Sequence, residues 1–330
     1  MTGTGVKRVA ITGSSGYLGT KLIEHLRRQH GHAEILGIDI RAPGRTGPSP
    51  DRFVTLDILS GELAGVLQDF RPDTVVHAAF VFTPMRDRQK MRRINVEGCR
   101  NLLDAAAGAG VERLMLVSSA TAYGASADNP VPIDDMQPLR SSAFQYAADK
   151  VEMEALADQF AVRHPDIAVS CVRPAIIAGA GLDNYLYRFI FKPIVVVLPD
   201  GYDMPVQFVH EDDVVSAMLA ILTAGARGPF NIGPPDWCLA STIAAETRRR
   251  TLRLPLGPIK ALYRLAWAVH LPIYDSPVEF LDFARYPWVV APNRLERELG
   301  FRFRHSSHAT LLETVRSRQP SGKQRVPAAR

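Results

Sequence analysis

The chain has 330 residues, 46% of them hydrophobic and 22% charged, as expected for a globular protein with a substantial core. Its 24 Gly and 24 Pro residues are too few for a collagen-like or disordered chain, and three scattered cysteines exclude a disulfide framework or a CxxC metal pair. The formal net charge is +5, but residues 316–330 carry five basic and no acidic groups, so the rest is neutral, unlike a nucleic-acid-binding protein.

Short apolar runs alternate with segments of helical periodicity through the first half of the chain. Residues 17–28 are an example, because the apolar residues at positions 18, 22, 23 and 26 lie on one helix face. Residues 89–109 predict a long helix that ends near Gly108 and Gly110. We predict strands at 9–12, 35–39, 53–57, 74–79, 114–119 and 168–173, and helices at 17–28, 61–70, 89–109 and 144–164.

This alternation predicts an α/β protein with a Rossmann-type doubly wound parallel sheet, because strands separated by helices pair in parallel through right-handed crossovers. After residue 173 the pattern becomes irregular, and a smaller C-terminal substrate lobe is expected. We predict a core at 1–173, a lobe at 174–315 in which about 206–233 return to the core, and a basic disordered tail at 316–330. The later predicted elements are helices at 212–222, 259–269 and 277–284 and a strand at 230–232.

The sequence gives no sign of secretion or of a membrane span. The first residues, MTGTGVKR, lack the apolar stretch of a signal peptide. Arg188, Lys192 and Pro193 interrupt the longest apolar run, and we interpret the stretch Leu262–Trp267 as core or dimer surface, with a membrane anchor as the alternative. We therefore expect a cytoplasmic protein that binds no nucleic acid and does not insert into a membrane.

A glycine-rich turn, TGSSGYLG at 12–19, links the first strand to the first helix. The glycines allow a tight turn and bring the backbone close to a pyrophosphate, which the free N–H groups of the helix start can bind. Asp39 ends the second strand, where a carboxylate accepts hydrogen bonds from an adenosine ribose. These features predict that residues 1–173 bind a dinucleotide, and the alternative is a glycine turn that binds nothing. Asp39 favours NAD because it repels the additional phosphate of NADP, but Arg41 could pair with that phosphate, so NADP stays open.

Tyr146 and Lys150 lie four residues apart and so share one face of the predicted helix at 144–164. A nearby ammonium stabilises a phenolate and lowers the pKa of the phenol towards neutral pH, where it exchanges protons efficiently. Ser119 ends a predicted strand and is placed either to bond a substrate carbonyl or to cap the backbone. We predict that Tyr146 transfers the proton, Lys150 lowers its pKa and holds the nicotinamide ribose, and Ser119 orients the substrate oxygen.

Taken in order, the glycine turn, Asp39, HAA at 77–79, Asn95, SSATAYG at 118–124, the Tyr–Lys pair, RP at 173–174, HEDD at 210–213 and NIG at 231–233 form one set. The set resembles the extended short-chain dehydrogenase/reductases, in particular the NAD-dependent epimerase/dehydratase branch. The resemblance runs from about residue 7 to 233, with a weaker match at 294–301, and residues 234–292 resemble nothing we can place.

The resemblance implies a catalytic triad, Ser119, Tyr146 and Lys150, and a homodimer formed through the helices at 89–109 and 144–164. It also implies that Ala78, Ala79 and Asn95 lie along the dinucleotide. Asp57 and Ile58 fit a pair that touches the adenine, although Asp57 also fits the start of a turn. The predicted cofactor-binding residues are Gly13, Gly16, Tyr17, Leu18, Gly19, Asp39, Arg41, Asp57, Ile58, Ala78, Ala79, Asn95, Tyr146, Lys150 and Pro174.

Departures from the family pattern reduce the range of reactions and substrates that we expect for this chain. The dehydratases carry an Asp–Glu pair where this chain has Ala120 and Thr121, so the elimination of water lacks its acid and base. Members that act on UDP-sugars carry Asn and Arg where this chain has Ile176 and Val206. A dianion needs fixed cations, whereas an apolar cleft suits a lipophilic ketone or alcohol. Alternatively, these side chains are ordinary packing and Arg188 or Arg285 contacts a phosphate. The predicted substrate pocket comprises Phe80, Phe82, Thr121, Ile176 and Val206.

We therefore predict an NAD(P)-dependent oxidoreductase that interconverts a secondary alcohol and a ketone on a small, lipophilic substrate. The alternatives are an NDP-sugar 4-epimerase with tightly bound NAD and a non-catalytic redox sensor. No metal site is predicted, because His210, Asp212 and Asp213 fit the start of a helix and no further ligand is spaced for zinc. His305 and His308 are expected on the surface.

Overall fold

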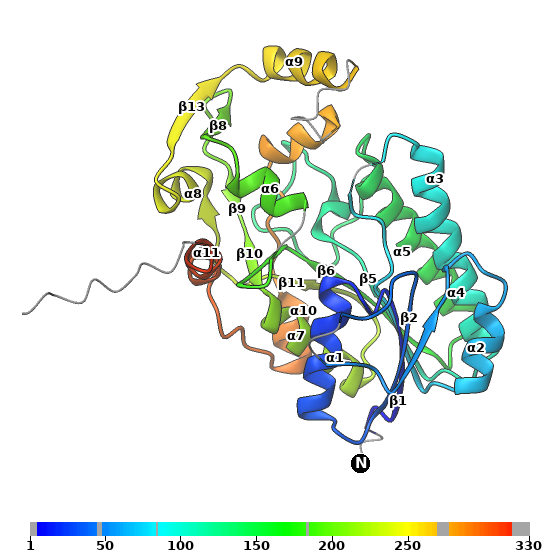
Figure 1. The fold of residues 1–330 in the computed structure, drawn as a ribbon. Coiled ribbons are helices and arrows are strands. Elements are labelled where there is room, and N and C mark those ends of the chain that lie inside the picture. The colour runs from blue at the N-terminus through cyan, green and yellow to red at the C-terminus, as the bar shows by residue number, and fades with distance from the viewer. Residues whose placement is uncertain (1–4, 45–47, 84, 183–184, 269–276, 319–330) are drawn as a thin grey trace, which may run out of the picture.

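The computed structural model describes residues 5–44, 48–83, 85–182, 185–268 and 277–318. Its centre is a sheet of seven parallel strands in the order β11-β6-β5-β4-β1-β2-β3 (Figure 1). The predicted Rossmann-type class is confirmed, since the chain order reverses between β1 and β4. The strands are β1 Arg8–Thr12, β2 Glu34–Asp39, β3 Arg52–Thr55, β4 Thr74–His77, β5 Arg113–Val117, β6 Ala168–Pro174 and β11 Gly228–Ile232.

Helices cover both faces of this sheet, because alternate side chains of each strand point to opposite sides. Val9 and Ile11 of β1 pack into the core under α1 and α7, whereas Ala10 packs into the core under α2, α4 and α5. Both faces are apolar, as a buried parallel sheet requires. The covering helices are α1 Tyr17–Gln29, α2 Leu63–Phe70, α4 Gly98–Ala107, α5 Gln145–Arg163 and α7 Glu211–Ala224.

The helix predicted at 89–109 is not regular. It consists of α3 Arg88–Arg92, a π-helical turn η1 at Arg93–Glu97 and then α4. A β-carbon added to Gly98 would lie 2.5 Å from Ile58 Cγ2, so the helix passes closely over the loop after β3. The π turn contains Asn95, whose contacts described below explain the irregular winding.

A buried ion pair joins α5 to the sheet. The Arg173 guanidinium lies 2.7 Å from the Glu154 carboxylate, and it also donates to the Tyr123 hydroxyl at 2.7 Å. The Ser118 hydroxyl donates to the same carboxylate. This network fixes α5 against the ends of β5 and β6.

The lobe is built from short two-stranded pairs and helices, as Figure 1 shows above the sheet. β7 Ile176–Ala178 pairs with β10 Phe208–His210, β9 Pro205–Val206 with β12 Cys238–Leu239, and β8 Val195–Pro199 with β13 Arg250–Leu254. The remaining helical elements of the chain, in the lobe and in the core, are a 3₁₀ turn η2 Ala120–Tyr123, α6 Tyr185–Phe191, α8 Ala240–Glu246, α9 Leu256–Ala268, a 3₁₀ helix η3 Val278–Ala284, α10 Asn293–Leu299 and α11 Ser307–Arg316.

The prediction that disorder begins at residue 316 sets the start of the disordered tail too early in the sequence. Arg316 is the last residue of α11, and the Arg318 guanidinium lies 5.1 Å from the ring centroid of Tyr187 and donates to the Leu182 carbonyl. These contacts order residues 316–318, and the remainder of the predicted tail, 319–330, lies outside the described residues. In the described part of the chain, we find no helix with the length and apolar composition that a bilayer span requires.

Candidate active site

The glycine turn lies at the point where the strand order of the sheet reverses. Gly13 follows β1 and has φ +73°, and a β-carbon added to it would lie 2.5 Å from the Ala79 nitrogen and 2.6 Å from the Ala78 carbonyl carbon. Gly19 is equally confined, because a β-carbon there would lie 2.3 Å from the Gly13 oxygen. Only glycine fits these two positions, and the structure brings the turn against the predicted Ala78–Ala79 segment.

The first turn of α1 keeps its anion-binding capacity. Gly16, at the N-cap, supplies no side-chain acceptor, and the first turn contains no acidic residue. Among the described residues, the buried Ser14 hydroxyl also lacks a hydrogen-bond partner. Free N–H groups and a positive dipole end therefore meet at this turn, and they fit the pyrophosphate of a dinucleotide.

Hydrogen bonds of the Asp39 carboxylate link the glycine turn to the end of β2. One carboxylate oxygen accepts from the Ser15 N–H at 3.1 Å, the other from the Arg41 N–H at 3.0 Å. The Ser15 hydroxyl donates to the Arg41 carbonyl at 2.7 Å. Carboxylate oxygens have two acceptor positions each, so Asp39 retains acceptors for ribose hydroxyls.

Other predicted cofactor residues have structural roles. Asp57 accepts from the Leu59 N–H at 2.9 Å, so its side chain begins a turn, and Ile58 packs in the core. Asn95 is fully buried, accepts from the Val81 N–H at 2.8 Å and donates to Asp149 at 2.8 Å. Asn95 thus ties the loop after β4 to α5.

Three further predicted cofactor residues take different positions. The Tyr17 hydroxyl donates to Glu211, and the Lys21 ammonium lies 2.9 Å from the same carboxylate. Burial raises the pKa of Glu211 to about 7. Leu18 packs against the core, and Pro174 is buried at the end of β6.

The predicted catalytic side chains converge beside the carboxyl end of β5. Tyr146 stands in the first turn of α5 and Lys150 one turn later, and both side chains are buried. The Ser119 hydroxyl accepts from the Thr121 N–H at 3.2 Å and from the Thr121 hydroxyl at 2.9 Å, so it caps η2. The same hydroxyl opposes the rise that burial causes in the pKa of the neighbouring Tyr146 phenol. The Ser119 hydroxyl and the Tyr146 phenol therefore lie at the same place in the site. A substrate carbonyl oxygen bound there could accept a hydrogen bond from either group.

The expectation that Lys150 lowers the Tyr146 pKa is wrong for this structure. Burial raises the pKa of Tyr146 to about 12, and the Ser119 hydrogen bond opposes this increase only in part. The Lys150 ammonium donates to the Val117 carbonyl at 2.5 Å and lies 3.4 Å from the Phe80 ring centroid. Because it faces that ring and burial lowers its own pKa to about 7, it does not stabilise a phenolate.

Aromatic rings surround the Tyr146 phenol. The ring centroids of Phe80, Phe82 and Phe144 lie 5.4, 5.1 and 5.8 Å from that of Tyr146. Phe280, from η3, packs on Phe144. Beside Tyr146 is a small hollow of about 30 Å³, lined by Met85, Arg86, Arg88, Met91, Phe144, Gln145, Tyr146 and Pro277.

Ile176 and Val206 lie apart from this aromatic cluster. Both are buried with Phe208 and Cys238 in the core of the lobe. The structure therefore gives them a packing role, while Phe80, Phe82 and Thr121 adjoin Ser119 and Tyr146.

Arg285, one of the two arginines considered as phosphate-binding cations, is already paired with other protein groups. Its guanidinium lies 3.0 Å from the Asp200 carboxylate and over the rings of Tyr202 and Tyr286. Arg88, on the wall of the hollow, pairs with Glu279 at 2.9 Å. Arg188, the other candidate, is exposed on α6.

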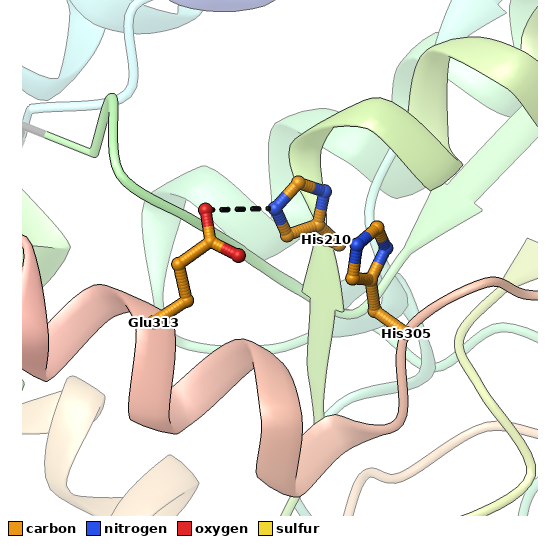
Figure 2. Close-up of side chains that lie close together, drawn as sticks. All are labelled: His210, His305 and Glu313. Atoms are coloured by element: carbon orange, nitrogen blue, oxygen red, sulfur yellow. Dashed lines mark ion pairs between the residues drawn. The ribbon is translucent and has the colours of Figure 1, made fainter.

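Figure 2 shows a cluster that the sequence did not reveal, in which potential ligand atoms of His210, His305 and Glu313 lie within 4.8 Å of one another. The two imidazole rings stack, with centroids 3.9 Å apart and planes at 25°. Lone pairs of stacked rings point in nearly parallel directions, so they do not meet at one metal ion. His210 Nδ1 accepts from the Asp212 N–H at 3.2 Å, which leaves the proton of a neutral ring on Nε2, 3.3 Å from Glu313. Among the side chains that the structure describes, His210 Nε2 has no hydrogen-bond partner, and the arrangement favours a histidine–carboxylate ion-pair contact over a metal centre.

The predicted surface position is correct for His308, which is exposed and lies 3.0 Å from Glu246. It is wrong for His305, which is half-buried because it stacks on His210 and because its Nδ1 lies 3.1 Å from Asp213. A separation of 95 residues hides this contact from local sequence patterns.

The buried Lys150 makes the stability of the cofactor-free protein depend on pH. Its folded pKa of about 7 is below the ordinary 10.5, so between these values the unfolded chain binds the additional proton. The free energy of unfolding should then increase with pH from about 7 to about 10, by about 1.4 kcal/mol per pH unit from this group. Urea unfolding of wild type and of Lys150→Met, each at about pH 7 and about pH 9, measures this increase in the free energy of unfolding. The increase should be smaller in Lys150→Met, and equal increases would contradict the assignment.

Comparisons with known proteins agree with this architecture. A model of the NAD dependent epimerase/dehydratase family matches residues 9–233. An uncharacterized protein of Mycobacterium tuberculosis is 29% identical over 304 residues, which cover 89% of this chain and 80% of that protein. The UDP-glucose 4-epimerase of Mycolicibacterium smegmatis is 30% identical over 247 residues, covering 68% of this chain and 77% of that enzyme.

Solved structures share the fold at lower identity. A UDP-glucose 4-epimerase from Thermotoga maritima, crystallised with UDP-glucose, has a TM-score of 0.75 at 18% identity, covering 94% of this chain and 98% of that one. MoeE5 in complex with UDP-glucuronic acid and NAD has a TM-score of 0.72 at 23% identity, with the same coverage of 94% and 98%.

Proposed function

The chain belongs to the NAD-dependent epimerase/dehydratase family, and from that premise we propose that it is an oxidoreductase that uses NADH to reduce a small lipophilic ketone to a secondary alcohol. One observation carries this proposal: the Tyr146 phenol, beside the Ser119 hydroxyl, stands among the rings of Phe80, Phe82 and Phe144. Such surroundings favour an apolar substrate with one polar group to bind.

Charge near the site supports the same substrate class. Arg88 and Arg285 are each paired with a carboxylate, and the Lys150 ammonium faces the Phe80 ring. A diphosphate would need cations that are free to pair with it. The side chains in contact with the Tyr146 ring itself are aromatic, although Arg86 and Arg88 also line the hollow beside it.

The protonation state of Tyr146 is compatible with ketone reduction. Burial raises its pKa to about 12, so the phenol carries at neutral pH the proton that a ketone oxygen would accept. Ser119 orients that oxygen, and the phenylalanines exclude water. NADH supplies the hydride when bound. The glycine turn and Asp39 hold the dinucleotide, and the Asp39 carboxylate disfavours the additional phosphate of NADP.

The second candidate is a nucleotide-sugar 4-epimerase, which the 30% identity to the Mycolicibacterium smegmatis enzyme favours. The two functions differ in net chemistry, because an epimerase returns the hydride to the substrate and consumes no NADH. A non-catalytic redox sensor would bind the cofactor and convert no substrate.

A panel of apolar aliphatic and aryl ketones, followed by the absorbance of NADH, tests the proposal, with UDP-glucose and UDP-galactose analysed in parallel by chromatography. We expect NADH consumption with at least one apolar ketone and no interconversion of the UDP-sugars. Interconversion without NADH consumption would establish the epimerase instead. NADH binding with no turnover of either substrate class would favour the sensor.

A further inference from the structure

The outward side of α9 is apolar. Leu262 and Leu265 are 54% and 62% exposed, and Ala261 and Ala268 on the same side are also exposed. Ile259 and Tyr263 of α9 are half-buried and Ala266 is buried, and the helix contacts η3. A helix that is apolar on both sides is normally buried, so the exposed side of α9 needs a partner.

The strand pair of β8 and β13, which precedes α9 in the sequence, also exposes apolar side chains. Ile194, next to β8, is 90% exposed, and Leu252 and Leu254 of β13 are 44% and 36% exposed. In Figure 1, α9 and β13 lie together at the end of the lobe farthest from the sheet. Of the twelve large apolar side chains found exposed among the described residues, five belong to this surface, which we call the α9 surface: Ile194, Leu252, Leu254, Leu262 and Leu265.

The α9 surface is bordered by positive charge. Residues 247–268 contain six basic and no acidic groups. The basic side chains of Arg250, Arg253 and Arg264 are exposed, and within the described ranges none of them lies in an ion pair. A partner that covers the leucines must therefore also accept several cations.

We propose that the α9 surface docks on an anionic phospholipid bilayer, with α9 lying in the interface. Exposed leucines bordered by lysine and arginine are the pattern of interfacial helices, whose apolar side enters the headgroup region while the cations bind anionic lipid. The leucines are exposed, so the expectation that 262–267 form core is wrong for them.

A second copy of this chain fits the α9 surface less well. Two such surfaces face to face would bring like charges together with no acidic partner in 247–268. The helices through which the family resemblance implies a dimer are α3 to α5, which lie beside the sheet and away from α9 in Figure 1.

The α9 surface is joined to the wall of the candidate active site. The Lys260 ammonium lies 2.6 Å from the Asp282 carboxylate in η3. η3 also supplies Phe280 and Phe283, which pack on Phe144 beside Tyr146. Docking would thus place this wall behind α9, on the side of the helix that faces away from the lipid. The proposal itself does not depend on the reaction, because its test measures binding.

Co-sedimentation with vesicles of phosphatidylcholine, alone or with one third phosphatidylglycerol, tests the proposal on the full-length protein. We expect binding to the anionic vesicles at least about tenfold tighter than to the neutral ones, weakened by salt. The double variant Leu262→Asp/Leu265→Asp should lose at least about tenfold in affinity. Arg250→Glu/Arg253→Glu should lose the preference for anionic lipid. Met136→Asp is the matched control, because Met136 is 66% exposed elsewhere, and it should bind like wild type.

Thermal unfolding checks that each variant is folded, and sedimentation velocity measures its oligomeric state. The proposal is overturned if wild type does not bind anionic vesicles, or if the leucine variant binds them as tightly as wild type does. Dissociation of a dimer by the leucine variant, without vesicle binding by wild type, would assign the surface to a second copy.

Discussion

Replacement of Tyr146 by Phe is expected to lower kcat for ketone reduction by about a hundredfold to ten-thousandfold, the range of a lost general acid. The Kd for NADH should change little, because the ring and its contacts with Phe80 and Phe82 remain. Burial keeps the phenol protonated, so the substitution removes the proton that the ketone oxygen needs. Steady-state kinetics and calorimetry measure the two quantities separately.

Tyr123→Phe is the matched control for this prediction. Tyr123 is also buried, and burial raises its pKa to about 12 as well, but its hydroxyl accepts from Arg173 at 2.7 Å and donates to Asn231 at 2.8 Å. Its loss should lower the free energy of unfolding by about 1–3 kcal/mol and leave kcat within a few-fold. Equal losses of kcat in the two variants would remove Tyr146 from the proposed role.

Substitution of Gly13 by Ala is expected to abolish measurable NAD binding and to lower the free energy of unfolding by about 2 kcal/mol or more. The added methyl group would lie 2.5 Å from the Ala79 nitrogen, and φ is +73°. The turn must open to accommodate it, which moves the N–H groups that face the pyrophosphate. Calorimetric titration with NAD and urea unfolding test both effects.

Gly110→Ala is the control that separates the effect of strain at a positive φ from the effect of a clash between the added methyl group and nearby atoms. Gly110 has φ +76°, but a β-carbon there would meet no atom within 4 Å. The variant should lose about 1–2 kcal/mol of stability and bind NAD like wild type. Normal NAD binding by Gly13→Ala would contradict the dinucleotide site.

The fold and the glycine turn could be predicted because their signals are local. Alternating apolar runs indicate strands and helices, and a right-handed connection then leaves few topologies. The distance between Asp39 and Ser15 also follows, since neighbouring parallel strands end at the same edge of the sheet. These inferences need no knowledge of side-chain packing.

The electrostatics of the triad could not be predicted in the same way. The spacing of Tyr146 and Lys150 on a helix indicates that they are neighbours, but it does not show that Phe80 covers the ammonium. Burial, which no residue pattern states, then determines both pKa values. The stacking of His210 on His305 and the packing of Ile176 inside the lobe arise from similar long-range contacts.

The central claim is that Tyr146 protonates a ketone while the cofactor transfers a hydride to the same carbonyl group. Incubation with NADH deuterated at the transferable position of the nicotinamide, followed by mass spectrometry of the product, tests it most directly. The account predicts one deuterium on the carbinol carbon of an apolar alcohol, and far less product with Tyr146→Phe. Conversion of UDP-glucose to UDP-galactose in a parallel incubation with NAD, together with no labelled alcohol from the incubation with NADH, would contradict it.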